Sequence, residues 1–207
     1  MIEKVLSDYL VVGAGAMGMA FTDVLITETD ATVTIVDRHS HPGGHWNDSY
    51  PFVRLHQPSS FYGVNSRELG NDTKDLVGGN AGLYELASGT EVVTYFDQVM
   101  NQQFLPSGRV RYLPTSEYLG DGLIRDLISG IEVVVDARKT VNATYMNVTV
   151  PAVTTPSYDV MEGVQCIPPN ELPSITTTPD GYVVIGGGKT AIDSCLWLLS
   201  NDVNPEA

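Results

Sequence analysis

The apolar residues of the amino-terminal stretch follow a strand, helix, strand order. Four apolar residues at positions 9–12 precede three glycines, and an apolar, small-residue segment at 17–26 follows them. A second apolar run covers positions 31–36 and ends on an acid. Short apolar runs bounded by glycine are typical of buried strands, whereas the longer segment is typical of a helix. The pattern predicts a βαβ unit built on a parallel sheet.

The periodicity of apolar positions changes twice further along the chain. Positions 63–82 show no sustained period and are expected to form a long loop, whereas apolar residues at helical intervals predict a helix over 89–104. From position 109 the period becomes two, and Gly-containing turns divide the region into short strands. We expect a further parallel strand at 109–113, a three-stranded antiparallel meander at 116–119, 123–128 and 131–135, and a return strand at 140–144.

The opening pattern recurs near the end of the chain. Residues 146–180 are rich in Pro and Thr, which favours a connection without a helix or central strand. A strand is expected at 181–185, followed by a G-x-G-x-x-A loop and a helix over 192–199. The predicted fold class is α/β: a Rossmann-like domain at 1–145 with parallel sheet, crossover helix and small meander, a connection at 146–180, and the start of a second Rossmann-like unit at 181–207.

The first glycine loop has the G-x-G-x-x-G spacing of a dinucleotide site. Gly13 permits the sharp turn, Gly15 lets a pyrophosphate approach the main chain, and Gly18 lets the helix pack closely on the strand. Asp37 ends the second strand 19 residues after Gly18, where an acid accepts hydrogen bonds from an adenosine ribose. Strand, loop, helix, strand and acid in this order predict a dinucleotide-binding domain.

Composition and charge exclude several classes of partner. Eleven basic and 25 acidic residues give a net charge of −14, which disfavours nucleic acid or an anionic membrane as the main partner. The first eight residues lack a signal-peptide pattern, and no apolar run is long enough for a membrane helix, so a cytoplasmic protein is expected. Four histidines fall within positions 39–56, but their spacing does not predict a metal site.

A second glycine pair changes the expected cofactor. Gly43 and Gly44 stand two residues before Trp46, just beyond the ribose acid. A plain NAD domain needs no such pair, whereas the longer FAD molecule runs past this loop. Two nucleotide loops with Gly-Gly-x-Trp between them resemble the two-dinucleotide flavoproteins, and most closely the flavin-containing and Baeyer–Villiger monooxygenases and related NAD(P)/FAD-dependent oxidoreductases.

This resemblance implies FAD on the first unit and NAD(P)H, with NADPH favoured, on the second. Position by position it implies a set of cofactor-binding residues along both loops, the segment after the second strand, the meander and the return strand: Gly13, Gly15, Ala16, Met17, Gly18, Asp37, Arg38, Gly43, Gly44, His45, Trp46, His56, Gln57, Ser59, Tyr118, Ala143, Thr144, Gly186, Gly188, Lys189, Thr190 and Ala191. No catalytic residue is assigned, because the cofactor carries the chemistry.

The sequence departs from the family at two points. Tyr145 replaces the glycine usual after Ala143 and Thr144, and the F-x-G-x-x-x-H-x-x-x-W fingerprint of the monooxygenases is missing. The expected function is therefore an FAD-dependent oxidoreductase that takes a hydride from NAD(P)H and acts on a small-molecule substrate, with monooxygenase-like chemistry left open. The alternatives are a flavin-binding module without turnover and an NAD-dependent dehydrogenase that uses the first loop. The second unit looks truncated, so a carboxy-terminal segment, a partner chain or a homo-oligomer is expected to complete it.

Overall fold

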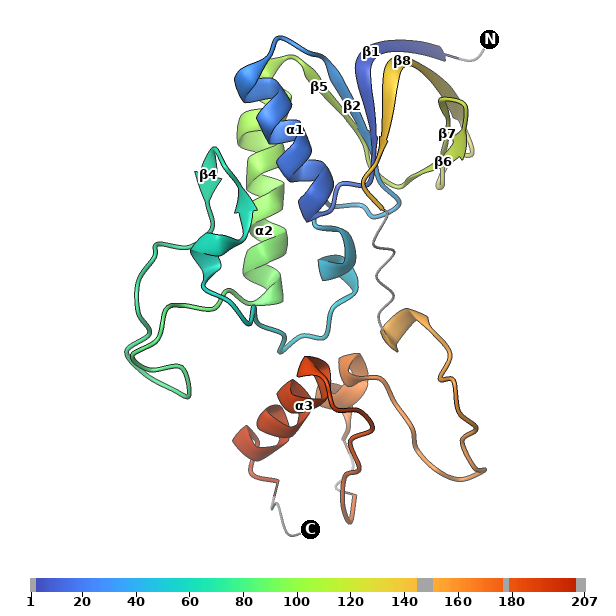
Figure 1. The fold of residues 1–207 in the computed structure, drawn as a ribbon. Helices are drawn as coiled ribbons and strands as arrows, with labels where there is room; N and C mark the ends of the chain where they lie inside the picture. Colours follow the sequence, from blue (N-terminus) through green and yellow to red (C-terminus); the bar gives the residue numbers. More distant parts are fainter. Residues whose placement is uncertain (1–2, 145–150, 177–178, 204–207) are drawn as a thin grey trace.

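A computed structural model describes residues 3–144, 151–176 and 179–203, and its centre is a six-stranded sheet (Figure 1). The strand order is β5-β2-β1-β8-β7-β6, and β5, β2, β1 and β8 run parallel to one another. The strands are β1 (Glu3–Val12), β2 (Val33–Val36), β5 (Val110–Leu113), β6 (Ser116–Gly120), β7 (Leu123–Asp126) and β8 (Glu132–Asn142). This arrangement confirms the predicted α/β, Rossmann-like fold.

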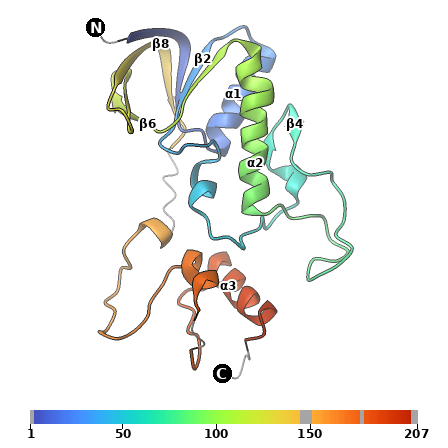
Figure 2. The ribbon, with the colours of Figure 1, turned by 180° about the vertical axis from the view of Figure 1, so that it is seen from behind.

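Two helices cover one face of the sheet, as Figures 1 and 2 show from opposite sides. Helix α1 (Ala16–Glu28) follows β1, and α2 (Gly89–Val99) continues into a wider turn over Met100–Phe104. Fully buried side chains from both helices, among them Met19 and Phe96, join Val11 and Ile35 of the sheet in the larger core. Ser88 begins α2 with a capping box, in which its hydroxyl and the Glu91 carboxylate each satisfy a main-chain N–H. The helical interval of apolar residues over 89–104 therefore predicted this element correctly.

The meander covers part of the other face of the sheet. Strands β6 and β7 pair antiparallel, and β7 pairs antiparallel with the start of β8. Ile124 of β7 and Val135 of β8 pack with Val5, Leu10 and Val36 in a second, smaller core. The meander follows β5 directly in the chain. Its first strand is attached to the end of β2, because the Ser116 N–H donates to the Asp37 carbonyl at 2.8 Å.

One prediction about this region was wrong. The third meander strand and the return strand are a single element, β8, which stays parallel to β1 along its whole length. The polar stretch at 136–139 suggested a break. Its side chains are solvated at the sheet surface instead, and Asp136 forms a 2.9 Å ion pair with Lys4 of β1.

The loop after the second strand contains two short strands, β3 (Gly63–Val64) and β4 (Arg67–Glu68), which form a hairpin beside α1. The hairpin is fixed to α1 by the buried Asp23 carboxylate, which accepts the Ser66 N–H at 3.0 Å. The sequence pattern predicted only a loop here, because two-residue strands leave no periodicity.

The carboxy-terminal part contains short turns and helix α3 (Lys189–Ser200). The predicted helix is confirmed, but the predicted strand at 181–185 is not formed, because no strand among the described residues pairs with it. Tyr145, the domain boundary predicted at 145–146 and the last residues of the chain lie outside the described residues. Along residues 3–144, 151–176 and 179–203, no helix is long and apolar enough to cross a membrane.

Candidate functional site

The first glycine loop joins β1 to α1 in a conformation that requires glycine at two positions. Gly13 has φ +106°, and a Cβ there would lie 2.9 Å from Thr144 Cγ2. A Cβ at Gly18 would overlap the Gly13 carbonyl oxygen and would lie 3.3 Å from Ala143 Cβ. Gly13 therefore makes the turn and Gly18 allows the helix to approach it closely, as predicted. Both contacts involve the end of β8, so Ala143 and Thr144 lie against the loop.

The second glycine pair lies directly against the first loop. The Gly43 N–H donates to the Ala14 carbonyl at 2.8 Å. A Cβ at Gly44, where φ is +57°, would lie only 2.9 Å from Gly15 Cα. Gly15 itself has an ordinary φ of −75°, and a Cβ there would lie 3.5 Å from Gly44 Cα. Two main-chain segments that are bare, that is, without side chains at the contact, thus meet at the end of β1 and the start of α1.

The amino-terminal end of α1 has the electrostatics of an anion site. Gly15 precedes the helix and has no side chain with which to cap it, and the first turn, which begins at Ala16 and Met17, contains no acidic residue. Met17 is 68% exposed, so this turn faces solvent. Free N–H groups and the positive end of the helix dipole at such a position favour phosphate. This is the end of α1 at which the sequence predicts a pyrophosphate.

Asp37 lies at the end of β2, buried beneath the same loop. Its Oδ2 accepts the Ala14 N–H at 2.6 Å, and its Oδ1 accepts the His39 N–H at 2.8 Å. The His39 ring also contacts Oδ1, through Nδ1 at 2.9 Å. The acid predicted for the ribose is therefore hydrogen-bonded to the glycine loop on one oxygen and to His39 on the other.

His39 lies between two carboxylates. Its second ring nitrogen, Nε2, is 2.8 Å from Asp48 Oδ2, in the 3-10 turn η1 (Gly44–Asp48). Hydrogen bonding to Asp37, followed by that to Asp48, raises the pKa of His39 to about 9 although burial opposes the shift. The ring is thus a protonated imidazolium at neutral pH. Both nitrogens are occupied, and within the described residues no group of three His, Cys, Asp or Glu side chains could hold a metal ion.

Sequence reasoning did not assign His39 or Asp48 to the site. The available signal was an imidazole two residues after the ribose acid, but its second partner is nine residues further on. That separation becomes a contact only because Gly43 and Gly44 reverse the chain, both with positive φ. A third unassigned group is Tyr112 on β5, whose buried hydroxyl has no hydrogen-bond partner among the residues that the structure describes and whose pKa is raised chiefly by burial and further by Asp37.

An aromatic cluster follows the second glycine pair. His45 stacks on Trp46 with ring centroids 5.3 Å apart, and the Trp46 indole N–H donates to the Tyr62 hydroxyl at 2.7 Å. Burial lowers the pKa of His45, so this imidazole favours its neutral form. Tyr62 packs edge-on against Phe96 of α2. The cluster fixes η1 on the helix layer beside the glycine loops.

The other predicted residues of the first unit lie at different depths. Arg38 and His56 are exposed, and Gln57 is half-buried. Ser59 is buried, and its hydroxyl donates to the Glu85 carbonyl at 2.9 Å and accepts the Ala87 N–H at 2.8 Å, so it links two loop segments. Tyr118 lies on β6, two residues after Ser116, whose N–H donates to the Asp37 carbonyl. Its side chain packs against the smaller core. Contact between these residues and a cofactor stays a prediction.

The second glycine loop lies apart from the first, at the amino-terminal end of α3 (Figure 1). Gly186 has φ +138°, Gly188 precedes the helix, and the Ala191 N–H donates to the Gly188 carbonyl. Thr190, in the first turn, is half-buried. Lys189 forms an ion pair with Asp193 one turn later, so its charge is already partly neutralised.

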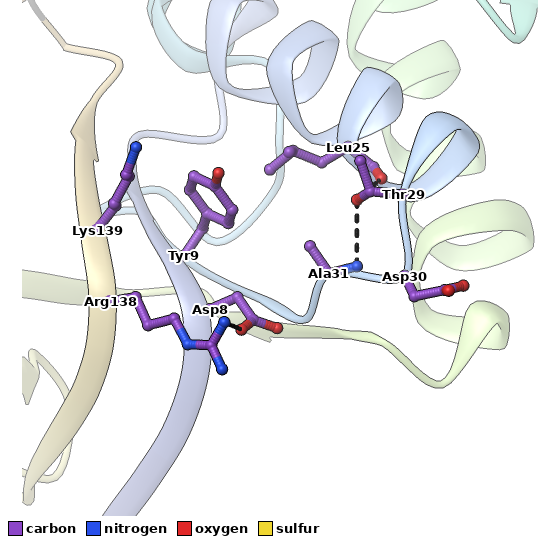
Figure 3. Close-up of a pocket in the computed structure, with 8 residues that line it drawn as sticks. All are labelled: Asp8, Tyr9, Leu25, Thr29, Asp30, Ala31, Arg138 and Lys139. Atoms are coloured by element: carbon purple, nitrogen blue, oxygen red, sulfur yellow. Dashed lines mark hydrogen bonds and ion pairs between the residues drawn. The ribbon is translucent and has the colours of Figure 1, made fainter.

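A cavity of about 460 Å³ lies elsewhere on the first unit, at the carboxy-terminal end of α1 (Figure 3). It is lined by Asp8, Tyr9, Leu25, Thr29, Asp30, Ala31, Arg138 and Lys139. The length of α1, about 20 Å, separates it from the glycine loop. Arg138 is 83% exposed and pairs with Asp8 at 3.3 Å, an arrangement typical of a solvated surface. This cavity does not coincide with the candidate dinucleotide site.

Comparison with curated proteins finds long relatives in mycobacteria. The chain is 60% identical over 200 residues to "Uncharacterized protein Rv2000" of Mycobacterium tuberculosis and, to the same extent, to "Uncharacterized protein Mb2023" of Mycobacterium bovis. The match covers 97% of this chain and 37% of each relative. The chain thus spans little more than a third of the length of these relatives.

Comparison with solved structures finds monooxygenases. The chain is similar to a flavin-containing monooxygenase from Stenotrophomonas maltophilia, at 17% identity and a TM-score of 0.45, over 68% of this chain and 38% of that one. It is also similar to an oxidized steroid monooxygenase bound to NADP, at 24% identity and a TM-score of 0.45, over 67% of this chain and 26% of that one.

A family model matches a segment of the first unit. Residues 11–59, from the end of β1 to the start of the 3-10 turn η2 (Ser59–Phe61), match the NAD(P)-binding Rossmann-like domain. This span includes both glycine segments, Asp37, His39 and Asp48. The amino-terminal part of the chain thus has a Rossmann-like fold, and a segment of it is similar to this NAD(P)-binding domain.

Proposed function

We propose that this chain is the FAD-binding part, with the start of the NAD(P)H-binding part, of a flavin-dependent oxidoreductase. The observation that carries the proposal is the contact between Gly15 and Gly44, which joins two bare main-chain segments beside the α1 amino terminus. One glycine loop is enough for a nicotinamide dinucleotide. The second segment extends the same surface along the chain, which suits the longer flavin nucleotide.

The residues present fit such a cofactor. Gly13, Gly15 and Gly18 would hold its pyrophosphate with main-chain N–H groups and the α1 dipole. Asp37 has one oxygen with a single donor, Ala14 N–H, and therefore keeps acceptor capacity for an adenosine hydroxyl. When bound, FAD would supply the hydride acceptor that no side chain provides. The role left to the protein is to orient the cofactor and to keep water from it.

The second glycine loop would receive NAD(P)H once the remainder of its unit is in place. Val183 is 91% exposed and Ile185 67% exposed in the stretch before the loop. In the proposed enzyme these apolar side chains would be covered by further strands of the second unit, as in a complete parallel sheet. We propose that the chain by itself binds FAD and that hydride transfer requires the longer protein, which also supplies the small-molecule substrate site.

A second candidate function is that of a nicotinamide-dependent dehydrogenase without flavin. The observation that favours it is the match of residues 11–59 to a domain described as NAD(P)-binding, together with the acid at the end of β2. In this case Asp37 would read the ribose of NAD, and the second glycine pair would serve only to pack against the first loop.

Cofactor analysis separates the two candidates. The chain and its full-length relative are purified, denatured by heat, and the released small molecules are identified by absorbance and mass. We expect FAD from both proteins, and anaerobic addition of NADPH is expected to bleach the flavin of the full-length protein alone. Preparations that contain no FAD, do not take it up when it is added, and bind NAD would overturn the proposal in favour of the dehydrogenase.

A further inference from the structure

The imidazole of His39 joins three segments of the first unit. Its Nδ1 contacts Asp37 Oδ1 at 2.9 Å at the end of β2, and its Nε2 contacts Asp48 Oδ2 at 2.8 Å in η1. Asp37 continues the chain of hydrogen bonds to the Ala14 N–H in the glycine loop. The loop that carries the pyrophosphate contacts, the ribose acid and the second glycine segment are therefore held together through one ring.

The hydrogen bonds at Asp37 limit what its carboxylate can offer a ligand. A carboxylate has about four lone-pair sites. Two donors from His39, the main-chain N–H and ring Nδ1, occupy Oδ1, and the Ala14 N–H occupies one site of Oδ2. One site remains, on the oxygen next to the glycine loop. His39 thus determines which oxygen of Asp37 is available and in which direction it points.

We infer that His39 is a positioning residue of this dinucleotide site: held by Asp37 and Asp48, it directs the free acceptor of Asp37 toward one adenosine ribose hydroxyl. The inference rests on the proposed dinucleotide function but does not depend on which dinucleotide is bound. It assigns to His39 no contact with the ligand. His39 changes the affinity for the ligand by orienting Asp37. The ring can orient Asp37 in this way only while both of its nitrogens are protonated.

The surroundings of the ring define its titration. Asp37 and Asp48 face its two nitrogens, His45 is the neighbouring imidazole in η1, and Arg38 beside it in the chain is exposed. From the turn between β5 and β6, the Thr115 N–H donates to the His39 carbonyl and contributes no charge. From the 3-10 turn η6 (Pro169–Ser174), the Asn170 amide donates to the Asp48 carbonyl. Loss of the ring proton is thus expected only above neutral pH, near the value of about 9.

The test combines a spectroscopic measurement with a binding measurement on the whole chain. In the cofactor-free protein, ¹⁵N NMR of labelled histidine is expected to show both nitrogens of one imidazole protonated at neutral pH and titrating near pH 9. The affinities for FAD and for ADP-ribose, a probe without flavin, are measured over the same range. In the wild type both dissociation constants are expected to rise above that pH as the ring proton is lost, by at most about tenfold per pH unit.

The variant His39→Asn keeps a donor near Asp37 but loses the charge and the reach to Asp48. We expect it to bind both probes about tenfold more weakly at neutral pH and without the pH dependence. His41→Asn is the matched control, because His41 is 61% exposed and lies outside this network; it should match the wild type. The inference is overturned if no imidazole of the protein titrates near pH 9, or if His39→Asn keeps the affinity and the pH dependence of the wild type. Failure of the wild type to bind either probe would instead remove the proposed function, while the NMR titration still reports on the charged ring.

Discussion

The Tyr50 hydroxyl donates a 2.7 Å hydrogen bond to the Asp193 carboxylate, although the two residues are 143 positions apart. Phe52, two residues after Tyr50, stacks on Trp197 of α3, with ring centroids 5.4 Å apart. These contacts attach α3 to the segment that follows η1. Because Lys189 pairs with the same carboxylate, Asp193 connects the second glycine loop to the first unit.

Tyr50→Phe should loosen α3 while leaving the sheet intact. The change keeps the ring beside Phe52 and removes the hydrogen bond to Asp193, a contact on the order of 1–2 kcal/mol. Hydrogen exchange is expected to accelerate over Lys189–Ser200 and to stay unchanged in β1 and β2. Tyr84→Phe, in an exposed loop, is the control. Equal protection of α3 in Tyr50→Phe and wild type would show that this bond does not hold the helix.

Gly18→Ala should destabilise the first unit severely. The added Cβ would overlap the Gly13 carbonyl oxygen, so the turn or the helix must move, at a cost of about 3 kcal/mol or more. Gly79→Ala is the control, because a Cβ there meets no atom within 4 Å. Urea unfolding of both variants measures the difference. Similar midpoints for Gly18→Ala and Gly79→Ala would contradict the close approach of α1 to the loop.

The stability of the first unit should fall at alkaline pH through His39. Its pKa in the folded state, about 9, lies above the ordinary value of 6.5. A raised folded-state pKa gives a stabilisation that is complete below about pH 6.5 and is lost as the pH rises through about 9. His39→Asn should lower the free energy of unfolding by about 1–2 kcal/mol at neutral pH and by less at pH 10. The comparison uses urea unfolding at both pH values; a constant difference between the two proteins would exclude this linkage.

Sequence patterns predicted the helices, strands and turns whose conformation is determined by residues nearby in the chain. The turn at Gly13 and the close packing at Gly18 were predicted correctly, because a G-x-G-x-x-G turn specifies its own main-chain geometry. The parallel strand β5 followed from the change of period at position 109. By contrast, β8 was divided in two, because its polar middle is part of a strand that pairs with β1, which lies over 100 positions away in the chain.

The parts that sequence could not predict depend on contacts across the chain. The stretch at 181–185 has the composition of a strand but no partner among the described residues. Nothing in the sequence distinguishes His39 from the other histidines. It bridges two carboxylates only because the fold brings Asp48 close to it. The contact expected between Ser59 and a cofactor ring stays a prediction, but the partners of its hydroxyl, Glu85 and Ala87, could not be predicted because they come from a loop with no recognisable pattern.

The central claim is that a dinucleotide contacts the bare main chain where the two glycine segments meet. Gly15→Ala tests it most directly, because the added Cβ would lie 3.5 Å from Gly44 Cα, an ordinary contact that should leave the stability of the free protein within about 0.5 kcal/mol. The measurement is the amount of FAD retained per chain by the wild type, Gly15→Ala and the Gly79→Ala control. We expect wild-type retention in Gly79→Ala and a loss of at least about tenfold in affinity in Gly15→Ala. Full retention of FAD by a folded Gly15→Ala protein would contradict the claim.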